Sequence, residues 1–313
     1  MTMRTPPRLA KSSPASAVDR SSLPEFTVDS LLKTPTVTVR DVYCRGSFPH
    51  SSADERATDT QLVFPYRGVY VRHLGHDEAV AEANQVLFFN AQEGYRVSHP
   101  VPGGDASLTL ILGEPHVDEL APPALLRYRR PLAFRRQRLR IDARAQALMA
   151  LLRHSLRENV AEPLEAECLA LTLAQRALGP RTTHAAGASA GRQRLVDRAK
   201  LVMAADLARR WTLAEIAAEV RGGSPVYLTQ VFQQVEGLPL YRYQLRLRLA
   251  RALDLLGQYH DLTALSLDLG FSSHSHFSAA FRAAYGRSPS EFRHAALGRA
   301  ARRSLRDRRR RIF

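Results

Sequence analysis

An internal repeat is the feature that most constrains this chain. Displacing the sequence by 49 residues aligns residues 212–237 with residues 261–286. The aligned pairs are apolar and turn residues, namely Leu213 with Leu262, Ile216 with Leu265, Val220 with Leu269, Ser224 with Ser273, Leu228 with Phe277, Phe232 with Phe281 and Gly237 with Gly286. One fold used twice retains its core positions and turns, so the repeat predicts two copies of a single supersecondary unit.

Each copy is predicted to be a short helix, a turn and a second helix. In the first copy, Thr212 and Glu215 have the spacing of a capping box, which satisfies backbone N–H groups where a helix begins. This helix is expected to end at residues 221–223, and the next to begin with Pro225 in its first turn. In the second copy the turn is expected at residues 270–272.

The second helix of each copy has an apolar and a polar face. The predicted core residues are Leu228, Val231, Phe232 and Val235 in the first copy, and Phe277, Ala280, Phe281 and Ala284 in the second. The outward residues are Val226, Thr229, Gln230 and Gln233 in the first copy, and His274, Ser275, Ser278, Ala279 and Arg282 in the second. A helix with such a small, polar face fits a DNA major groove and presents hydrogen-bonding groups to base edges.

A predicted spacer helix joins the two copies. Residues 240–256 contain neither Gly nor Pro, and Leu245, Leu249, Leu253 and Leu256 form a stripe along them with arginines around it. These 17 residues would span about 26 Å as a helix. The spacer is therefore expected to hold the reading helices one turn of DNA, about 34 Å, apart.

The basic charge of the chain is concentrated in the same region. The formal net charge is +15, and residues 192–313 carry 22 Arg and Lys against 10 Asp and Glu, a net charge of +12. Such an excess is typical of a domain that binds a polyanion. Charge alone leaves RNA and an anionic membrane open, and the repeated unit favours double-stranded DNA.

Residues 195–294 resemble the DNA-binding domain of the AraC/XylS-type transcriptional regulators. The most specific signatures are YLTQVFQQVEGLPLYRYQLRLRLARALDLL and LGFSSHSHFSAAFRAAYGRSPSEFR. The resemblance implies that bases are read by Val226, Thr229 and Gln230, and by His274, Ser275, His276, Ser278 and Ala279. Two positions depart from the family pattern, Gly222 in the first turn and Ser266 in place of a small Ala.

The first part of the chain has a β pattern followed by a helical one. Between residues 36 and 113, short apolar runs alternate with Pro, Gly, Asn and Asp, which is typical of a small barrel or sandwich. A connector rich in Pro and Arg follows at residues 122–140, and then Leu164, Cys168, Leu171 and Leu178 recur at helical spacing. This region looks like the cupin-type sensing domain and dimerisation helices of such regulators.

The predicted fold class is therefore an α+β multidomain protein with an N-terminal cupin-like β-barrel plus helices and a C-terminal all-α double helix-turn-helix domain. The predicted segments are a disordered N-terminus at 1–30, the barrel at 31–140, a helical dimerisation element at 141–179, a linker at 180–191 that tethers the domains loosely, the DNA-binding domain at 192–298 and a basic tail at 299–313.

A metal site was considered among the histidines. His73, His76 and His99 lie in or near predicted strands, but the tight H-x-H pattern with a downstream Glu is absent, and Glu82 or Glu93 would have to act as the carboxylate ligand. His274 and His276 are two residues apart on a helix and face different directions. Cys44 is predicted to be a strand residue and Cys168 a buried helix residue. No metal, cofactor or catalytic residue is predicted.

The expected function is the regulation of transcription, as an activator or a repressor. The protein is expected to be a homodimer, and its expected partners are double-stranded DNA, a small-molecule effector and RNA polymerase. The absence of an apolar leader or spanning segment predicts a cytoplasmic protein with no membrane partner. One alternative is a cupin-type metal-dependent enzyme fused to a DNA-binding module. Another is an architectural DNA binder without sequence preference.

Overall fold

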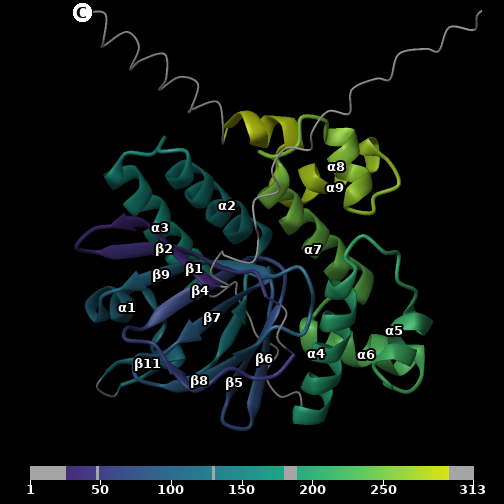
Figure 1. The fold of residues 1–313 in the computed structure, drawn as a ribbon, viewed down its shortest axis with the longest axis horizontal. Helices are drawn as coiled ribbons and strands as arrows, with labels where there is room; N and C mark the ends of the chain where they lie inside the picture. Colours follow the sequence, from purple (N-terminus) through teal and green to yellow (C-terminus); the bar gives the residue numbers. More distant parts are fainter. Residues whose placement is uncertain (1–25, 47–48, 129–130, 180–188, 296–313) are drawn as a thin grey trace, which may run out of the picture.

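The computed structural model describes residues 26–46, 49–128, 131–179 and 189–295. Within these ranges the N-terminal part consists of sheets and helices and the C-terminal part of helices alone, which confirms the predicted fold class (Figure 1). Most of the predicted disordered terminus and linker, and the whole basic tail at 299–313, lie outside the described residues. The predicted disorder is wrong for residues 26–30, because they form part of a strand.

Two antiparallel sheets build the N-terminal domain. The larger sheet contains, in spatial order, β1 (Phe26–Lys33), β2 (Val37–Cys44), β9 (Asp105–Leu112), β4 (Gln61–Arg67), β7 (Gln85–Phe89) and β12 (Arg138–Arg140). The smaller sheet contains β3 (Glu55–Arg56), β8 (Gly94–Ser98), β5 (Tyr70–Leu74) and β6 (Asp77–Ala81), and β10 (Leu126–Arg127) pairs with β11 (Ala133–Phe134). The predicted connector at 122–140 therefore contains three short strands.

The central strands β4 and β7 of the large sheet are buried on both faces. Leu62 and Phe88 belong to a core shared with the helices, whereas Val63 and Leu87, the neighbouring residues, belong to a core shared with the small sheet. A strand covered on both sides needs apolar residues at successive positions. This explains why QLVF and QVLFF read as continuous apolar runs rather than as alternating ones.

The helices of the N-terminal domain are α1 (Glu114–Leu120), the short 3-10 helix η2 (Pro123–Leu125), α2 (Ala143–Arg157) and α3 (Pro163–Leu178). The buried residues of α3 include Ala166, Ala170 and Leu173, whereas Leu164 and Cys168 are exposed. The predicted burial of Cys168 is therefore wrong, and of the residues predicted at helical spacing Leu178 is buried whereas Leu164 is exposed. Both faces of α3 carry apolar residues at helical spacing, and the face with alanines is the one that packs against the domain.

The C-terminal domain contains α4 (Ala190–Ala205), α5 (Leu213–Glu219), α6 (Pro225–Glu236), α7 (Leu240–Leu255), α8 (Leu262–Asp268) and α9 (His274–Tyr285). Residues 190 and 191 begin α4, so the linker predicted at 180–191 extends two residues into this helix. A further helix begins at Pro289, where Ser288 and Glu291 form the expected capping box. None of the helices in the described ranges is long and apolar enough to cross a membrane.

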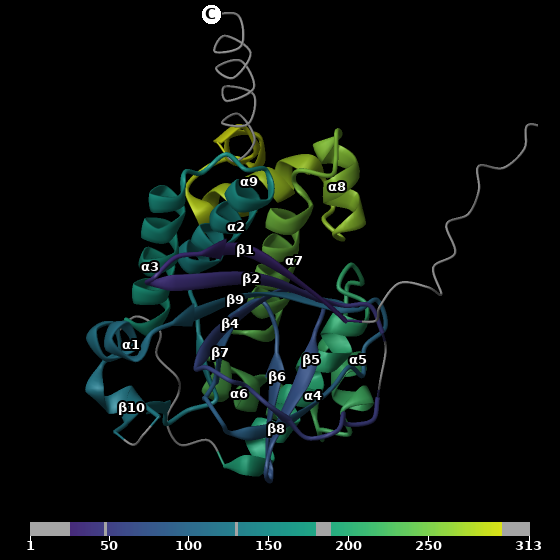
Figure 2. The ribbon, with the colours of Figure 1, turned by 60° about the vertical axis from the view of Figure 1, so that its left-hand side comes forward.

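The two domains pack against each other through α7 and α4. Figures 1 and 2 show α7 beside α2 and the edge of the barrel, and α7 contacts both α2 and β4, while α4 contacts β6. The two domains are therefore in direct contact, and the expectation that the linker tethers them loosely is wrong.

Candidate nucleic-acid interface

The two copies of the repeat form two helix-turn-helix units, α5 with α6 and α8 with α9. The predicted capping box of α5 is present, because the Thr212 side chain accepts from the backbone of Glu215 and the Glu215 side chain accepts from the backbone of Thr212. Ser224 and Ser273 cap α6 and α9. Both second helices end at a left-handed glycine, which explains why the repeat retains a glycine there.

The predicted faces of α6 and α9 are oriented as expected. Phe232 and Phe281 are fully buried, and Val226 on the opposite face of α6 is 66% exposed. The exposed candidates are Val226, Gln230, Gln233, His274, Ser275, His276, Ala279 and Arg282, and the half-buried ones are Thr229 and Ser278. Ala280 and Ala284, predicted as core, are half-buried. Each unit therefore presents a face of small and polar side chains to solvent.

Several of these candidate side chains already form hydrogen bonds with residues close by in the sequence. The Thr229 hydroxyl donates to the carbonyl of Pro225 at 2.9 Å. In this arrangement it can accept a hydrogen bond from DNA but has no second proton to donate. His274 pairs with Ser278 at 3.3 Å, and the His276 ring pairs with Ser272 at 3.1 Å. The two histidines therefore have separate polar partners and do not form a metal pair.

Arg248 on α7 locks the two units together. Its guanidinium donates to the carbonyls of Leu207 at 2.8 Å, Ala208 at 3.0 Å and Arg209 at 2.8 Å before the first unit, and to Gly270 at 3.2 Å in the second turn. A Cβ on Gly270 would lie 2.0 Å from the carbonyl oxygen of Ala208, so only glycine permits this approach. Sequence reasoning treated Arg248 as one of several basic residues around the spacer and missed this role.

The two departures from the family pattern have local explanations. Gly222 is buried, and a Cβ there would lie 2.8 Å from the side chain of Leu195 on α4. The Ser266 side chain is also buried, and its hydroxyl donates to the carbonyl of Thr263 at 2.8 Å. The first turn is thus closely packed.

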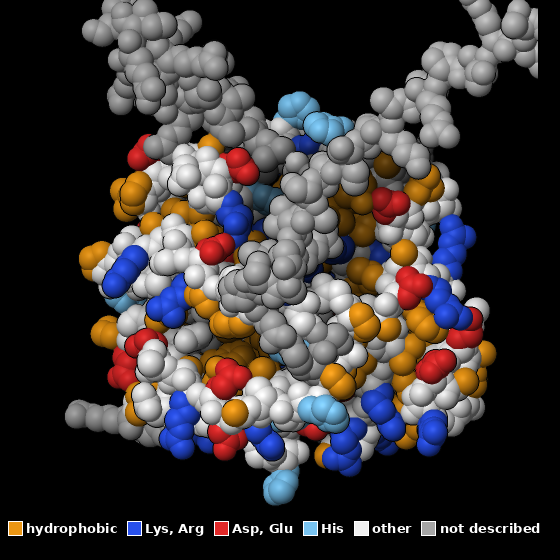
Figure 3. All heavy atoms as spheres, viewed as in Figure 1, with side chains coloured by type: hydrophobic (Ala, Val, Ile, Leu, Met, Phe, Trp, Pro, Cys, Tyr) orange, Lys and Arg blue, Asp and Glu red, His pale blue; other side chains and the backbone are white. Residues whose placement is uncertain are grey.

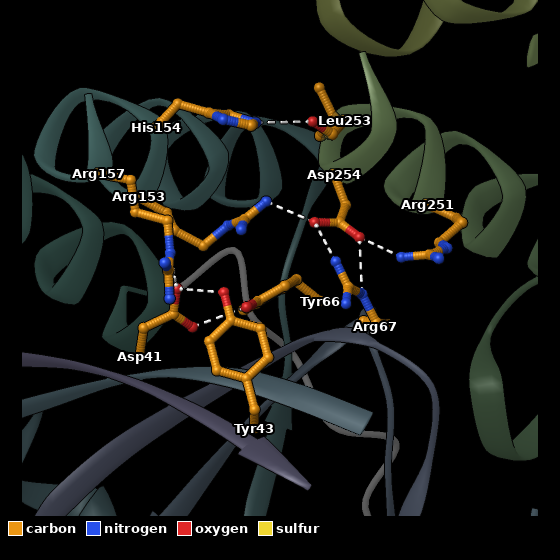
Figure 4. Close-up of polar contacts among 10 residues, drawn as sticks. All are labelled: Asp41, Tyr43, Tyr66, Arg67, Arg153, His154, Arg157, Arg251, Leu253 and Asp254. Atoms are coloured by element: carbon orange, nitrogen blue, oxygen red, sulfur yellow. Dashed lines mark hydrogen bonds and ion pairs between the residues drawn. The ribbon is translucent and has the colours of Figure 1, made fainter. Parts of the chain in front are cut away.

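A buried charge cluster connects the spacer helix with the N-terminal domain (Figure 4). Asp254 on α7 has a fully buried side chain and accepts from Arg153 of α2 at 2.5 Å and from Arg67 of β4 at 3.1 Å. Arg251 also contacts Asp254. The Arg153 guanidinium lies 4.0 Å from the ring centre of Tyr66.

The same network continues to strand β2. The Tyr66 hydroxyl donates to Asp41 at 2.7 Å, and Arg157 of α2 donates to Asp41 at 2.6 Å. Burial raises the pKa of Tyr66 far above its usual range, so the hydroxyl stays protonated and acts as the donor. A continuous set of polar contacts therefore runs from the barrel to the helix between the two reading units.

A second buried cluster joins α4 to the barrel. Lys200 on α4 lies 2.7 Å from Glu236 on α6 and 3.9 Å from Glu82, and Arg138 of β12 forms a two-point contact with Asp197 at 2.9 and 3.1 Å. Burial raises the pKa of Glu236, but Lys200 together with Arg138 and Arg140 outweighs it, so the pKa is lowered. Glu82, considered as a metal ligand, thus faces a lysine instead.

The N-terminal domain contains a large cavity of about 680 Å³, lined by both sheets. His73, His76 and His99 do not converge on it as a set. His73 pairs with Glu78 and Ser98, and His76 is exposed in the turn after β5. His99 does line the cavity, together with residues that the sequence did not connect with it, and Glu93 lies beside Arg72.

Basic side chains lie over the helical domain. In Figure 3, Lys and Arg side chains, interspersed with Asp and Glu, lie over the region where Figure 1 places α4, α5 and α6. Two rigidly connected helix-turn-helix units with exposed polar faces define the class of this part of the chain, a double helix-turn-helix DNA-binding domain.

Comparisons with known proteins agree with this class. Residues 217–295 match the family described as Helix-turn-helix domain. The HTH-type transcriptional activator RhaR of Klebsiella pneumoniae subsp. pneumoniae is 33% identical over 107 residues, which are 34% of this chain and 38% of RhaR. The chain thus matches well under half the length of this curated relative. Residues 217–295 are thus a helix-turn-helix domain, and the C-terminal part of the chain is similar to part of this transcriptional activator, which agrees with the resemblance to AraC/XylS-type regulators.

Two solved structures are similar to separate parts of the chain. An AraC-type transcriptional regulator from Chromobacterium violaceum is 35% identical and covers 34% of this chain and 94% of that chain, with a TM-score of 0.32. A cupin superfamily protein from Desulfitobacterium hafniense is 14% identical and covers 31% of this chain and 83% of that chain, with a TM-score of 0.24.

Proposed function

We propose that this chain is a sequence-specific, AraC-like transcriptional regulator that reads two adjacent major-groove segments of DNA. The observation that carries the proposal is that α6 and α9 expose their polar faces while α7 and Arg248 hold both units in one arrangement. The net charge of +12 on residues 192–313 favours the DNA backbone as the partner. The residues proposed to contact DNA are Val226, Thr229, Gln230, Gln233, His274, Ser275, His276, Ser278, Ala279 and Arg282.

Selection of duplexes from a random DNA library with the full chain tests this proposal. We expect a two-part motif with blocks about 10 base pairs apart. If roughly six phosphates are neutralised, log K falls against log[salt] with a slope of about −5. Binding without a shared motif would favour the architectural alternative. A flat salt profile would contradict DNA binding altogether.

The N-terminal domain is proposed to sense an effector rather than to act as an enzyme. A second, polar cavity of about 470 Å³ is lined by Arg45, Arg67 and Arg157, and Arg67 also holds Asp254 on α7. A ligand that binds Arg67 competes with Asp254 and changes how firmly the spacer helix is held. Such a ligand shifts the arrangement only through a difference in affinity between the two states.

The chain is further proposed to act as a homodimer in the cytoplasm, where it meets DNA and RNA polymerase. The outward face of α3 supports dimerisation, because Leu164 is 73% exposed and Cys168 follows one turn later. Two DNA-binding domains in one dimer raise the effective concentration on paired sites. Sedimentation of the full chain tests this: Leu164→Glu should give a monomer, whereas Leu267→Glu on α8, also at an exposed leucine, should remain dimeric. A monomeric parent chain would contradict the proposal.

A further inference from the structure

A cluster of three different metal-binding side chains lies in the barrel and has no part in the proposed reading of DNA. Cys44, His99 and Asp105 each offer one donor atom, and these atoms all lie within 4.8 Å of one another. The His99 Nδ1 atom lies 2.5 Å from the Asp105 carboxylate. The three groups therefore already interact as one unit.

The sheet holds the three residues in place. Cys44 ends β2 and is paired in register with Asp105, the first residue of β9. The turn before β9 approaches closely, because a Cβ on Gly104 would lie 2.3 Å from the Cys44 carbonyl oxygen. His99 follows directly after β8 of the other sheet. Cys44 and Asp105 are thus held by strand pairing, and His99 is held by the facing sheet. Such rigid placement of the ligands is what a metal site requires.

The combination of donors selects the kind of ligand. A thiolate favours soft or borderline ions, an imidazole suits zinc, and a carboxylate also binds zinc, so this mixed set is poor for calcium or magnesium. In a tetrahedral zinc site with bonds of 2.0–2.3 Å, the donor atoms lie about 3.3–3.7 Å apart. The donor atoms here lie within 4.8 Å of one another, and zinc binding would require His99 Nδ1 and the Asp105 carboxylate, now 2.5 Å apart, to separate.

We propose that Cys44, His99 and Asp105 bind a zinc ion whose fourth coordination position opens toward the cavity. All three residues line the cavity of about 680 Å³, and Cys44 and Asp105 also line the polar cavity beside Arg67. Three protein ligands with one open position are typical of sites in which zinc also binds an external ligand. This proposal replaces the sequence-based expectation that the protein has no metal.

Titration of the metal-free full chain with Co²⁺ under reducing conditions tests the site. We expect one equivalent to bind, with the near-ultraviolet charge-transfer band of a cobalt–thiolate bond, and Zn²⁺ to displace the cobalt. Cys44→Ser should abolish the band. Cys168→Ser, which removes the exposed cysteine on α3, is the matched control and should retain it.

A second measurement is needed because a substitution at a buried residue can disturb folding. Zinc that binds the folded chain raises its unfolding temperature. We expect this rise in the parent chain and in Cys168→Ser, and its loss in His99→Gln. Asp105→Asn removes a carboxylate ligand, so zinc binding should weaken by more than the roughly 10- to 100-fold that follows the loss of an outer-shell partner of a ligand. No cobalt band in the parent chain, or a band that Cys168→Ser removes and Cys44→Ser retains, would overturn the proposal. DNA binding by the same preparations is measured separately, and its outcome does not bear on the metal site.

Discussion

Arg153 on α2 donates to Asp254 on α7 at 2.5 Å, and their side chains are 5% and 0% exposed. The two residues are 101 positions apart in the chain. One belongs to the N-terminal domain and the other to the helix that separates the two reading units. This contact makes the spacer helix a shared element of both domains, which gives the barrel a direct physical route to the DNA-binding surface.

Asp254→Asn should strongly destabilise the protein. The substitution leaves the buried Arg153 without its counter-charge, and it replaces one of the two carboxylate oxygens that face Arg67, Arg153 and Arg251 by an NH2 group, which cannot accept. Removing one partner of a buried ion pair costs about 3–5 kcal/mol of unfolding free energy. Urea unfolding of the full chain measures the loss, with Glu219→Gln at an exposed carboxylate as control. Equal unfolding midpoints for the two variants would show that the cluster contributes nothing.

Arg248→Met should disturb the relative position of the two units. It removes hydrogen bonds to four carbonyl groups, of which those of Leu207 and Arg209 keep a donor in Gln244, whereas those of Ala208 and Gly270 lose the donor that Arg248 supplies. A hydrogen bond from a charged group contributes about 1.5–3 kcal/mol, and partial exposure of these contacts reduces the loss. We also expect the variant to accept DNA sites with altered spacing between the two blocks, which binding to a spacing series measures. Arg246→Met, at an exposed position on the same helix, should keep the parent preference for spacing. If Arg248→Met kept the spacing preference of the parent chain, the proposed role of Arg248 in fixing the two units would be wrong.

Gln230→Ala and His274→Ala should relax base preference at separate positions about 10 base pairs apart. Each substitution removes an exposed polar group from one reading helix and should cost about 1–3 kcal/mol on the preferred site. Gln234→Ala is the control, because the Gln234 side chain already accepts from Arg192 at 3.0 Å. Quantitative binding to single-base variants of the selected site gives the readout. If both substitutions affected the same base pair, the two-unit geometry would be wrong.

Stability should fall as the pH drops through about 6.5, partly because of His154. Burial and the neighbouring Arg153 lower the pKa of His154 below its usual 6.5, while its ring bonds the Leu253 carbonyl at 3.0 Å. The unfolded chain therefore takes up a proton at a pH where the folded chain does not, so this stabilisation is present above pH 6.5 and is lost below it.

Comparison of urea midpoints at neutral and mildly acidic pH measures this effect. His154→Gln removes the titrating group and should show a smaller loss on acidification than the parent chain. His76→Gln, at an exposed turn position, should behave like the parent. A parent-like pH dependence in His154→Gln would assign the effect to other groups.

Local patterns were sufficient to predict the secondary structure of most segments. The runs at 61–64, 85–90 and 94–99 are β4, β7 and β8, and the capping residues Thr212 and Ser224 begin α5 and α6 as expected. These features depend on neighbours a few residues apart, which the sequence displays directly. Strands β10 to β12 were missed because they are two or three residues long and lie among Pro and Arg.

The sequence by itself determined the repeated unit, its caps, its turns and the faces that α6 and α9 turn to solvent, because each depends on periodicity within one short segment. Only the tertiary structure decided that Asp254 meets Arg153, that Arg248 joins the two units, and that Cys44 lies beside His99 and Asp105. These contacts join residues far apart in the chain, and they exist because the register of the sheet and the packing of α7 against the barrel bring those residues together. No spacing rule along the chain encodes them.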